Sequence, residues 1–145
     1  MTRGLIVPAI QRSEVTVKVH TDARVDVVDV TDAVAAAVPA GVERGVCTAF
    51  VPHTTAGVIV NEAESGLLAD LEAALERLVP RDDGYEHDRV DDNADAHLRA
   101  TLLGSSVSVP VESGALALGT WQSVLLVECD GPRTRTLDVT TTTSA

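Results

Sequence analysis

The chain has 145 residues, and its 22 acidic against 11 basic side chains give a net charge of −11 at neutral pH. Such a charge repels the phosphates of nucleic acids and the headgroups of anionic lipids, which disfavours nucleic-acid and membrane binding. The three aromatic residues, Phe50, Tyr85 and Trp121, are too few to stack single-stranded bases or to fill a core. The length suits one globular domain with an aliphatic core, and we expect residues 1–145 to form it.

The N-terminus and the two cysteines bear on the cellular compartment. The first residues contain an apolar run interrupted by Pro8, which is too short for a signal peptide or a membrane span. Cys47 and Cys129 each lie in an apolar, strand-like run, so we expect two free, buried thiols in place of a disulfide. Both features fit a protein of the reducing cytoplasm.

The chain alternates between polar and apolar residues over residues 14–20 and again over residues 25–30. This period of two predicts two strands with one buried face each, and it places His20 in the first of them, exposed. An alanine-rich stretch then predicts a short helix that ends near Val38, with Thr31 or Asp32 as its N-terminal cap.

Two further strands are predicted over residues 46–51 and 56–60. Their connection contains the sequence Pro-His-Thr-Thr, so His53 lies where one strand ends and the next begins.

Leucines recur at helical spacing over residues 65–79, which predicts the longest helix. A highly polar loop follows over residues 81–92. Asn93 can cap another helix over residues 94–103, and His97 would lie in its first turns.

The last third of the chain predicts three or four strands, over residues 106–111, 116–118, 121–129 and 133–140. The last two are expected to form an antiparallel hairpin around residues 130–132, and residues 140–145 to be a frayed end. Two to three helices among about seven short strands indicate the α+β class, with one compact domain and a mixed or mostly antiparallel sheet.

Three of the four histidines, His53, His87 and His97, fall within 45 residues and are surrounded by polar residues. Neutral imidazole is the commonest protein ligand for zinc, and three histidines with an open position are typical of catalytic zinc sites. The two cysteines are too few for a closed structural site. Histidines that are merely exposed or hydrogen-bonded remain the alternative interpretation.

Six short motifs occur in order along the chain: PHTTAGVIVNE (52–62), YEH (85–87), DDNADAHL (91–98), LLGSS (102–106), LALGTWQ (116–122) and ECDGPR (128–133). Together they resemble the YjbQ family, which is also called secondary thiamine-phosphate synthase. The resemblance extends from about Cys47 to Arg135. It implies a compact α+β fold, a homotrimer, and a metal-compatible histidine site at or near subunit boundaries.

The resemblance assigns roles residue by residue. The three histidines match the His-Thr-Ser/Thr-Ala, Tyr-x-His and Asp-Asn-x-x-x-His motifs of the family, and are the predicted metal ligands. Residues expected around the same pocket are Asn61, Glu62, Asp92, Gly119, Trp121, Gln122 and Glu128. The segment after Glu62 and the loop between His87 and His97 are each about one residue shorter than the family pattern.

Several side chains could serve catalysis or substrate binding. Glu62 could act as a general base or a fourth ligand if its strand turns toward His53, and Asp92 could orient a liganding imidazole. The hydroxyl groups of Thr54, Thr55, Ser105 and Ser106 could bind phosphate oxygens, with Gly57 and Gly104 allowing close backbone approach. Arg133 and Arg135 are candidate anion clamps, and Trp121 is expected in the core or in a pocket wall.

The family name implies joining a pyrimidine diphosphate to a thiazole phosphate, with a metal assisting the departure of pyrophosphate. Ligation by histidines alone favours zinc, although magnesium would suit the diphosphate substrate. Two alternatives remain open: a metal-dependent hydrolase of a small phosphorylated metabolite, and a non-catalytic trimer that binds metal or metabolite. We therefore predict a cytoplasmic, thiamine-phosphate synthase-like transferase that acts on a small phosphorylated metabolite, with no nucleic-acid or membrane partner.

Overall fold

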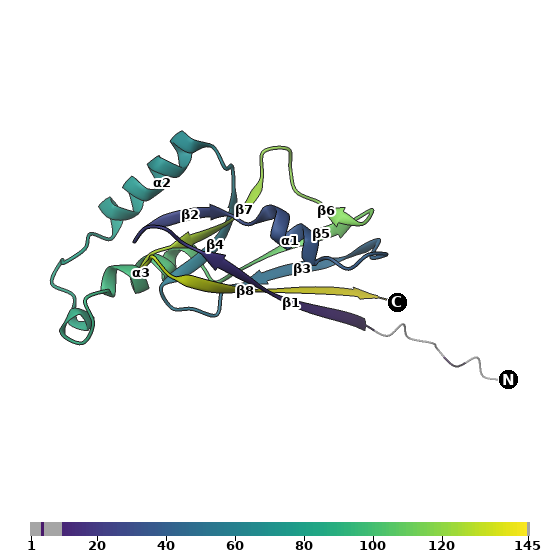
Figure 1. The fold of residues 1–145 in the computed structure, drawn as a ribbon, viewed down its shortest axis with the longest axis horizontal. Coiled ribbons are helices and arrows are strands. Elements are labelled where there is room, and N and C mark those ends of the chain that lie inside the picture. The colour runs from purple at the N-terminus through teal and green to yellow at the C-terminus, as the bar shows by residue number, and fades with distance from the viewer. Residues whose placement is uncertain (1–3, 5–9, 145) are drawn as a thin grey trace.

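Two antiparallel sheets form the body of the protein (Figure 1). The computed structural model describes residue 4 and residues 10–144, so the apolar run around Pro8 lies outside the described residues, as does Ala145. The larger sheet has the strand order β1-β8-β3-β5-β6, and the smaller sheet has the order β2-β7-β4. The α+β class and the antiparallel pairing predicted from the sequence are confirmed.

The larger sheet contains the two longest strands, β1 (Ile10–His20) and β8 (Thr134–Ser144), paired along their full length. The predicted frayed end is therefore wrong, because β8 continues to Ser144, opposite Ile10. The sheet is completed by β3 (Arg44–Phe50), β5 (Ser106–Glu112) and the short β6 (Ala115–Leu116).

The smaller sheet consists of β2 (Asp26–Asp29), β7 (Ser123–Glu128) and β4 (Ala56–Asn61). The predicted hairpin between the last two strands is wrong, since β7 and β8 belong to different sheets. Their connection instead contacts the loop between β1 and β2: Gly131 N donates to Arg24 O at 3.0 Å, and Thr21 N donates to Arg133 O at 2.9 Å. These contacts fix the connection at the point where the chain passes from the smaller sheet to the larger one.

The core between the sheets is aliphatic, as predicted. Val34 of the short helix α1 (Thr31–Ala37) contributes to it, together with inward-facing strand residues such as Leu126 and Val139. Neither predicted cap of α1 acts as one, because Asp29 Oδ1 accepts the N–H and hydroxyl of Thr31. The two cysteines are buried and free, as expected.

Two longer helices cover the smaller sheet. Helix α2 (Ser65–Leu78) begins after Glu64, whose carboxylate accepts the N–H groups of Gly66 and Leu67. The predicted leucine face is buried only in part: Leu75 packs against the sheet, whereas Leu78 is 71% exposed. A short 3₁₀ helix (Glu86–Arg89) precedes α3 (Ala94–Leu103). In the described part of the chain, no helix is long and apolar enough to cross a membrane.

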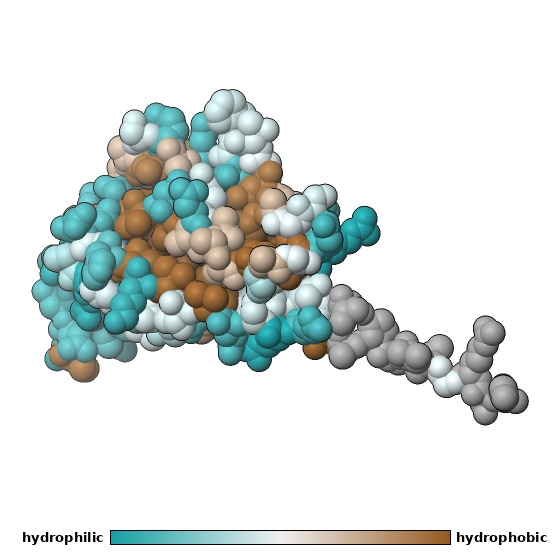
Figure 2. All heavy atoms as spheres, turned by 45° about the vertical axis from the view of Figure 1, so that its right-hand side comes forward, coloured by the Kyte–Doolittle hydropathy of each residue, from teal (hydrophilic) through white to brown (hydrophobic). Residues whose placement is uncertain are grey.

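Some large hydrophobic side chains remain on the surface. Figure 2 shows hydrophobic residues gathered in a band across one face of the molecule. Phe50 is 45% exposed and Trp121, in the loop before β7, is 73% exposed. Trp121 is therefore not in the core of the single chain, contrary to that part of the prediction.

Candidate functional site

A polar cavity of about 700 Å³ lies where β3 ends, beside α3 and the connection between β7 and β8. Its volume is within the range usual for small-molecule sites. Six predicted residues line it: His53, Thr54, Thr55, His97, Ser105 and Arg133. Arg135, the other predicted anion clamp, lines it as well.

His53 follows β3 and is held against β8. Its Nε2 accepts the backbone N–H of Thr136 at 3.0 Å and lies 3.1 Å from the Thr136 hydroxyl. Burial, followed by the positive charge of Arg135, lowers the pKa of His53 below its ordinary value. The ring is thus neutral at neutral pH, and since Nε2 is the acceptor, its proton is on Nδ1.

His97 lines the cavity, and His87 lies against His97 without lining the cavity itself. Their rings meet edge to face, with centroids 4.7 Å apart and an interplanar angle of 79°. Among the described residues, however, the nitrogens of the three histidines do not converge: the one group of three potential ligand atoms within 4.8 Å of one another is Asp82, Asp88 and Asp92. Single-chain geometry therefore supplies two neighbouring imidazoles and a third that is engaged by Thr136.

A buried ion pair supports the cationic wall of the cavity. Arg135 Nε donates to Glu128 Oε2 at 2.7 Å, Nη2 donates to Oε1 as well, and the two side chains are 4% and 0% exposed. Nη2 also donates to the Thr55 hydroxyl at 2.8 Å. Among the described residues, Nη1 has no hydrogen-bond partner, which leaves this nitrogen able to donate to a ligand.

Asp130 positions two other residues that line the cavity, Arg133 and Asn93. Its Oδ2 accepts from Arg133 Nη2 at 2.9 Å and from Asn93 Nδ2 at 3.0 Å. Asn93 occupies the N-cap position of α3, as predicted, but its side chain forms no capping hydrogen bond; Asp88 Oδ1 accepts the first N–H of the helix instead, at Ala94. Asp91, Asn93 and Asp130 line the cavity but were not predicted as site residues. The only signal for them was their position inside two of the sequence motifs.

Other predicted residues lie elsewhere in the chain. Asn61 and Glu62 line a separate groove of about 460 Å³ against α2. They are at the far end of β4, because the strand leads away from the cavity and Asn61 pairs with Ser123. Trp121 and Gln122 are exposed in the loop next to that end, and Gln122 Oε1 accepts the N–H of Gly119.

Asp92 and Gly57 do not have the roles predicted for them. Asp92 is exposed and forms an ion pair with Arg81 at 3.3 Å, so it does not orient a histidine. Gly57 faces the end of α3, where a Cβ atom would lie 2.8 Å from Gly104 O. Gly57 therefore permits strand and helix to pack closely and does not expose its backbone to a ligand.

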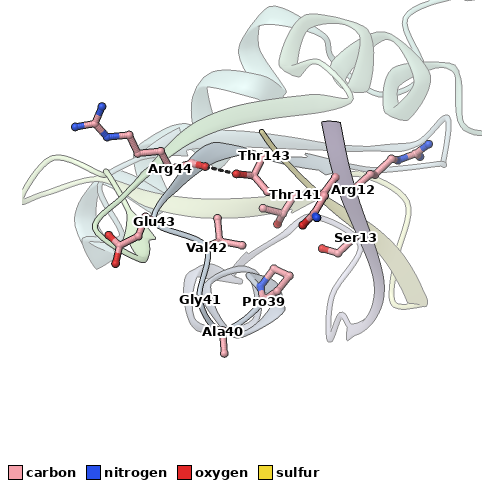
Figure 3. A pocket seen from close by; sticks show the side chains of 11 residues that line it. Arg12, Ser13, Pro39, Ala40, Gly41, Val42, Glu43, Arg44, Thr141 and Thr143 are labelled. Atoms are coloured by element: carbon pink, nitrogen blue, oxygen red, sulfur yellow. Dashed lines mark hydrogen bonds between the residues drawn. The ribbon is translucent and has the colours of Figure 1, made fainter. Parts of the chain in front are cut away.

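A second cavity, of about 510 Å³, lies between β1, β8 and the loop after α1 (Figure 3). Arg12 and Arg44 contribute to its lining, but Figure 3 shows their guanidinium groups pointing away from its centre. The cavity at His53 is the one that gathers histidines, arginines and hydroxyl groups, so it is the better candidate for chemistry.

The family of the chain follows from comparison with known sequences. A family model described as "UPF0047 protein YjbQ-like" matches residues 15–144. The chain belongs to the YjbQ family. Two relatives of this YjbQ protein are a UPF0047 protein of Archaeoglobus fulgidus, 55% identical over 84% of this chain and 94% of the relative, and YugU of Bacillus subtilis, 37% identical over 83% and 92%.

Solved structures support the same assignment of fold. A YbjQ-like protein of unknown function from Sulfolobus solfataricus P2 superimposes with a TM-score of 0.89 and 38% identity, over 92% of this YjbQ chain and 99% of the other. A hypothetical protein from Aeropyrum pernix K1 gives a TM-score of 0.85 and 40% identity, over 92% and 98%. The resemblance stated from six motifs is confirmed.

Proposed function

We propose that the His53 cavity binds the phosphate or diphosphate group of a small metabolite, and that the protein is an enzyme of the thiamine-phosphate synthase type. The observation that carries this proposal is the position of Arg135: Glu128 and Thr55 fix its guanidinium on one side, and Nη1 has no hydrogen-bond partner among the described residues. A buried, preoriented guanidinium is a strong donor to phosphate oxygens.

Neighbouring groups suit the same ligand. Arg133 is anchored to Asp130 through Nε and Nη2, which leaves its Nη1 for an anion. The hydroxyl groups of Thr54 and Ser105 can donate to phosphate oxygens, and His53 carries a proton on Nδ1. These donors offset, locally, the acidic charge of the whole chain.

In the proposed reaction, the thiazole nitrogen attacks the methylene carbon attached to the pyrimidine. The C–N bond forms while the C–O bond to the diphosphate breaks, and pyrophosphate leaves with the bonding electron pair. Arg135 and Arg133 would stabilise the charge that develops on the leaving oxygen.

A divalent ion, zinc by the donor set, is part of the proposal. His87 and His97 would hold it, because their rings already meet, and His53 is a third candidate whose Nε2 is engaged by Thr136. A bound ion would neutralise charge on the diphosphate. Elemental analysis tests this: metal lost in His87→Ala and His97→Ala but kept in His20→Ala supports the site, and no metal uptake by the unaltered protein refutes it.

A homotrimer would supply what one chain lacks at the site. Glu62, Asn61 and the Trp121 loop lie away from the cavity of their own chain, so these residues can serve it only from a neighbouring copy. The hydrophobic surface left exposed in the single chain supports such association. We also propose a cytoplasmic location, which the two free, buried thiols support.

The decisive experiment incubates purified protein with a pyrimidine diphosphate and a thiazole phosphate and follows thiamine phosphate by mass spectrometry. Turnover that falls in Arg133→Gln, but persists in the distant Arg44→Gln, is expected. Release of inorganic phosphate from either substrate alone would identify a hydrolase instead. Ligand binding without any turnover would leave a binding protein.

A further inference from the structure

The single lysine of the chain, Lys18, lies on the strand next to the one that contacts His53, although no motif contains it. It is exposed on β1, in register with Thr136 of β8. Residues directly opposite each other in an antiparallel pair project from the same face of the sheet. Lys18 and Thr136 are therefore neighbours on the outer face of the larger sheet.

Thr136 is also the residue that holds His53. Its N–H and its hydroxyl lie 3.0 and 3.1 Å from His53 Nε2. Only the width of β8 thus separates Lys18 from His53, and neighbouring strands are about 4.8 Å apart. The flexible four-carbon stem of a lysine can carry its ammonium group across that distance.

His20 extends the same surface by one more position. It is exposed and lies opposite Thr134, whose hydroxyl is 2.9 Å from His20 Nδ1. That contact leaves Nε2 of His20 for another partner. The acid nearest in register, Asp138, accepts a hydrogen bond from the Thr16 hydroxyl at 3.1 Å. Within the described residues, Lys18 forms no salt bridge, so its charge is uncommitted.

We propose that Lys18, with His20 and Thr136 beside it, forms a second anion subsite next to the His53 cavity. The ligand of the protein then carries two anionic groups, one bound by Arg135 and Arg133 and the other by Lys18. The inference rests on the proposed phosphate binding in the cavity, and it narrows the substrate class to molecules with two phosphate groups or a polyphosphate chain.

Calorimetric titration with inorganic phosphate, pyrophosphate and tripolyphosphate tests the subsite. Lys18→Gln should weaken tripolyphosphate binding roughly threefold to tenfold, as expected for one charge-assisted contact near solvent, and leave phosphate binding unchanged. Lys18→Arg should retain most of the affinity. Arg12→Gln is the matched control, because it removes a positive charge from the same strand and the same face, opposite Thr142.

A second measurement uses chemical labelling, because Lys18 is the single side chain that an amine-selective reagent can modify. Tripolyphosphate should slow the acylation of Lys18, measured by peptide mapping, whereas sodium chloride at the same ionic strength should not. Equal tripolyphosphate affinity in the unaltered protein and Lys18→Gln, without protection, overturns the subsite while phosphate binding in the cavity stands. Failure of the unaltered protein to bind any of the three anions overturns both proposals.

Discussion

Arg24 holds the carboxylate of Asp95 with two hydrogen bonds, at 2.8 and 3.0 Å. Asp95 is 1% exposed and also lies 3.4 Å from Nη1 of Arg99. Burial alone would raise the pKa of Asp95, but the hydrogen bond and charge of Arg24, followed by the charge of Arg99, hold it below its ordinary value. The interaction ties the first turn of α3, which carries His97, to the loop between β1 and β2.

Asp95→Asn should therefore destabilise the fold. Arg99 is 2% exposed, and the substitution leaves its charge buried without a carboxylate. Losing one member of a buried pair costs about 3–5 kcal/mol, which urea denaturation monitored by circular dichroism would measure. Asp83→Asn, in the exposed loop, is the control and should leave the midpoint unchanged. An equally unchanged midpoint for Asp95→Asn would show that the hydrogen bonds from Arg99 to Val79 O suffice to hold the buried charge.

Glu72 on α2 predicts a pH-dependent stability. Burial, then the charges of Asp26 and Glu76, raise its pKa above the ordinary glutamate value. The folded state then binds the proton more tightly than the unfolded state, so stability falls as the pH rises from the ordinary pKa through the raised one.

Glu72→Gln should stabilise the protein above that window, by about 0.2–0.5 kcal/mol from the removed i,i+4 repulsion with Glu76, and have no effect below it. Thermal unfolding at several pH values measures the difference between the variant and the unaltered protein. A benefit that persists unchanged in acid would show that charge is not its cause. Asp70→Asn, on the exposed face of the same helix, provides the comparison.

The two thiols should be inert while the protein is folded. Burial raises the pKa of Cys129 to about 12, and burial also raises that of Cys47 despite the neighbouring Thr141 hydroxyl. At pH 8, a thiol with the pKa of Cys129 is ionised to about one part in ten thousand, and the thiolate is the reactive form. An aromatic disulfide reagent should modify neither cysteine before unfolding and both in urea. Rapid labelling of folded Cys47 would indicate local opening of β3.

The secondary structure was largely predictable because it follows from local periodicity. The leucine spacing of α2 and the alternation in β1 are properties of neighbouring residues. The partner of β7 was not predictable from its sequence, because the turn residues at 130–132 also suit a hairpin. The hairpin is excluded by the contact of Gly131 with Arg24, which lies more than a hundred residues away along the chain.

The candidate site was predictable in part for a similar reason. His53, Thr54 and Thr55 come together because they are consecutive, and His97 joins them because α3 packs against β4. Glu62 shares a motif with His53, but a straight strand separates the two ends of that motif. The ion pair between Arg24 and Asp95 was not predictable, because the sequence around either residue does not indicate the other as its partner.

The contact between β4 and α3 provides the last prediction, since it fixes the helix that carries His97. Val58 N donates to Gly104 O at 3.1 Å, and a Cβ atom at Gly57 would lie 2.8 Å from both Gly104 O and Leu103 Cβ. The first of these is a backbone atom that cannot move without displacing the end of the helix. Gly57→Ala should accordingly cost about 1–3 kcal/mol, as overpacking does elsewhere.

The same substitution should also alter the His53 cavity, although Gly57 does not line it. Displacement of α3 changes the position of His97, so Gly57→Ala should also weaken pyrophosphate binding in calorimetry. Gly4→Ala, where no atom of the described residues lies within 4 Å of the added Cβ, should change neither stability nor binding. Reduced stability with unchanged binding would mean that the helix yields only at its C-terminal end, so that the position of His97 does not depend on Gly57.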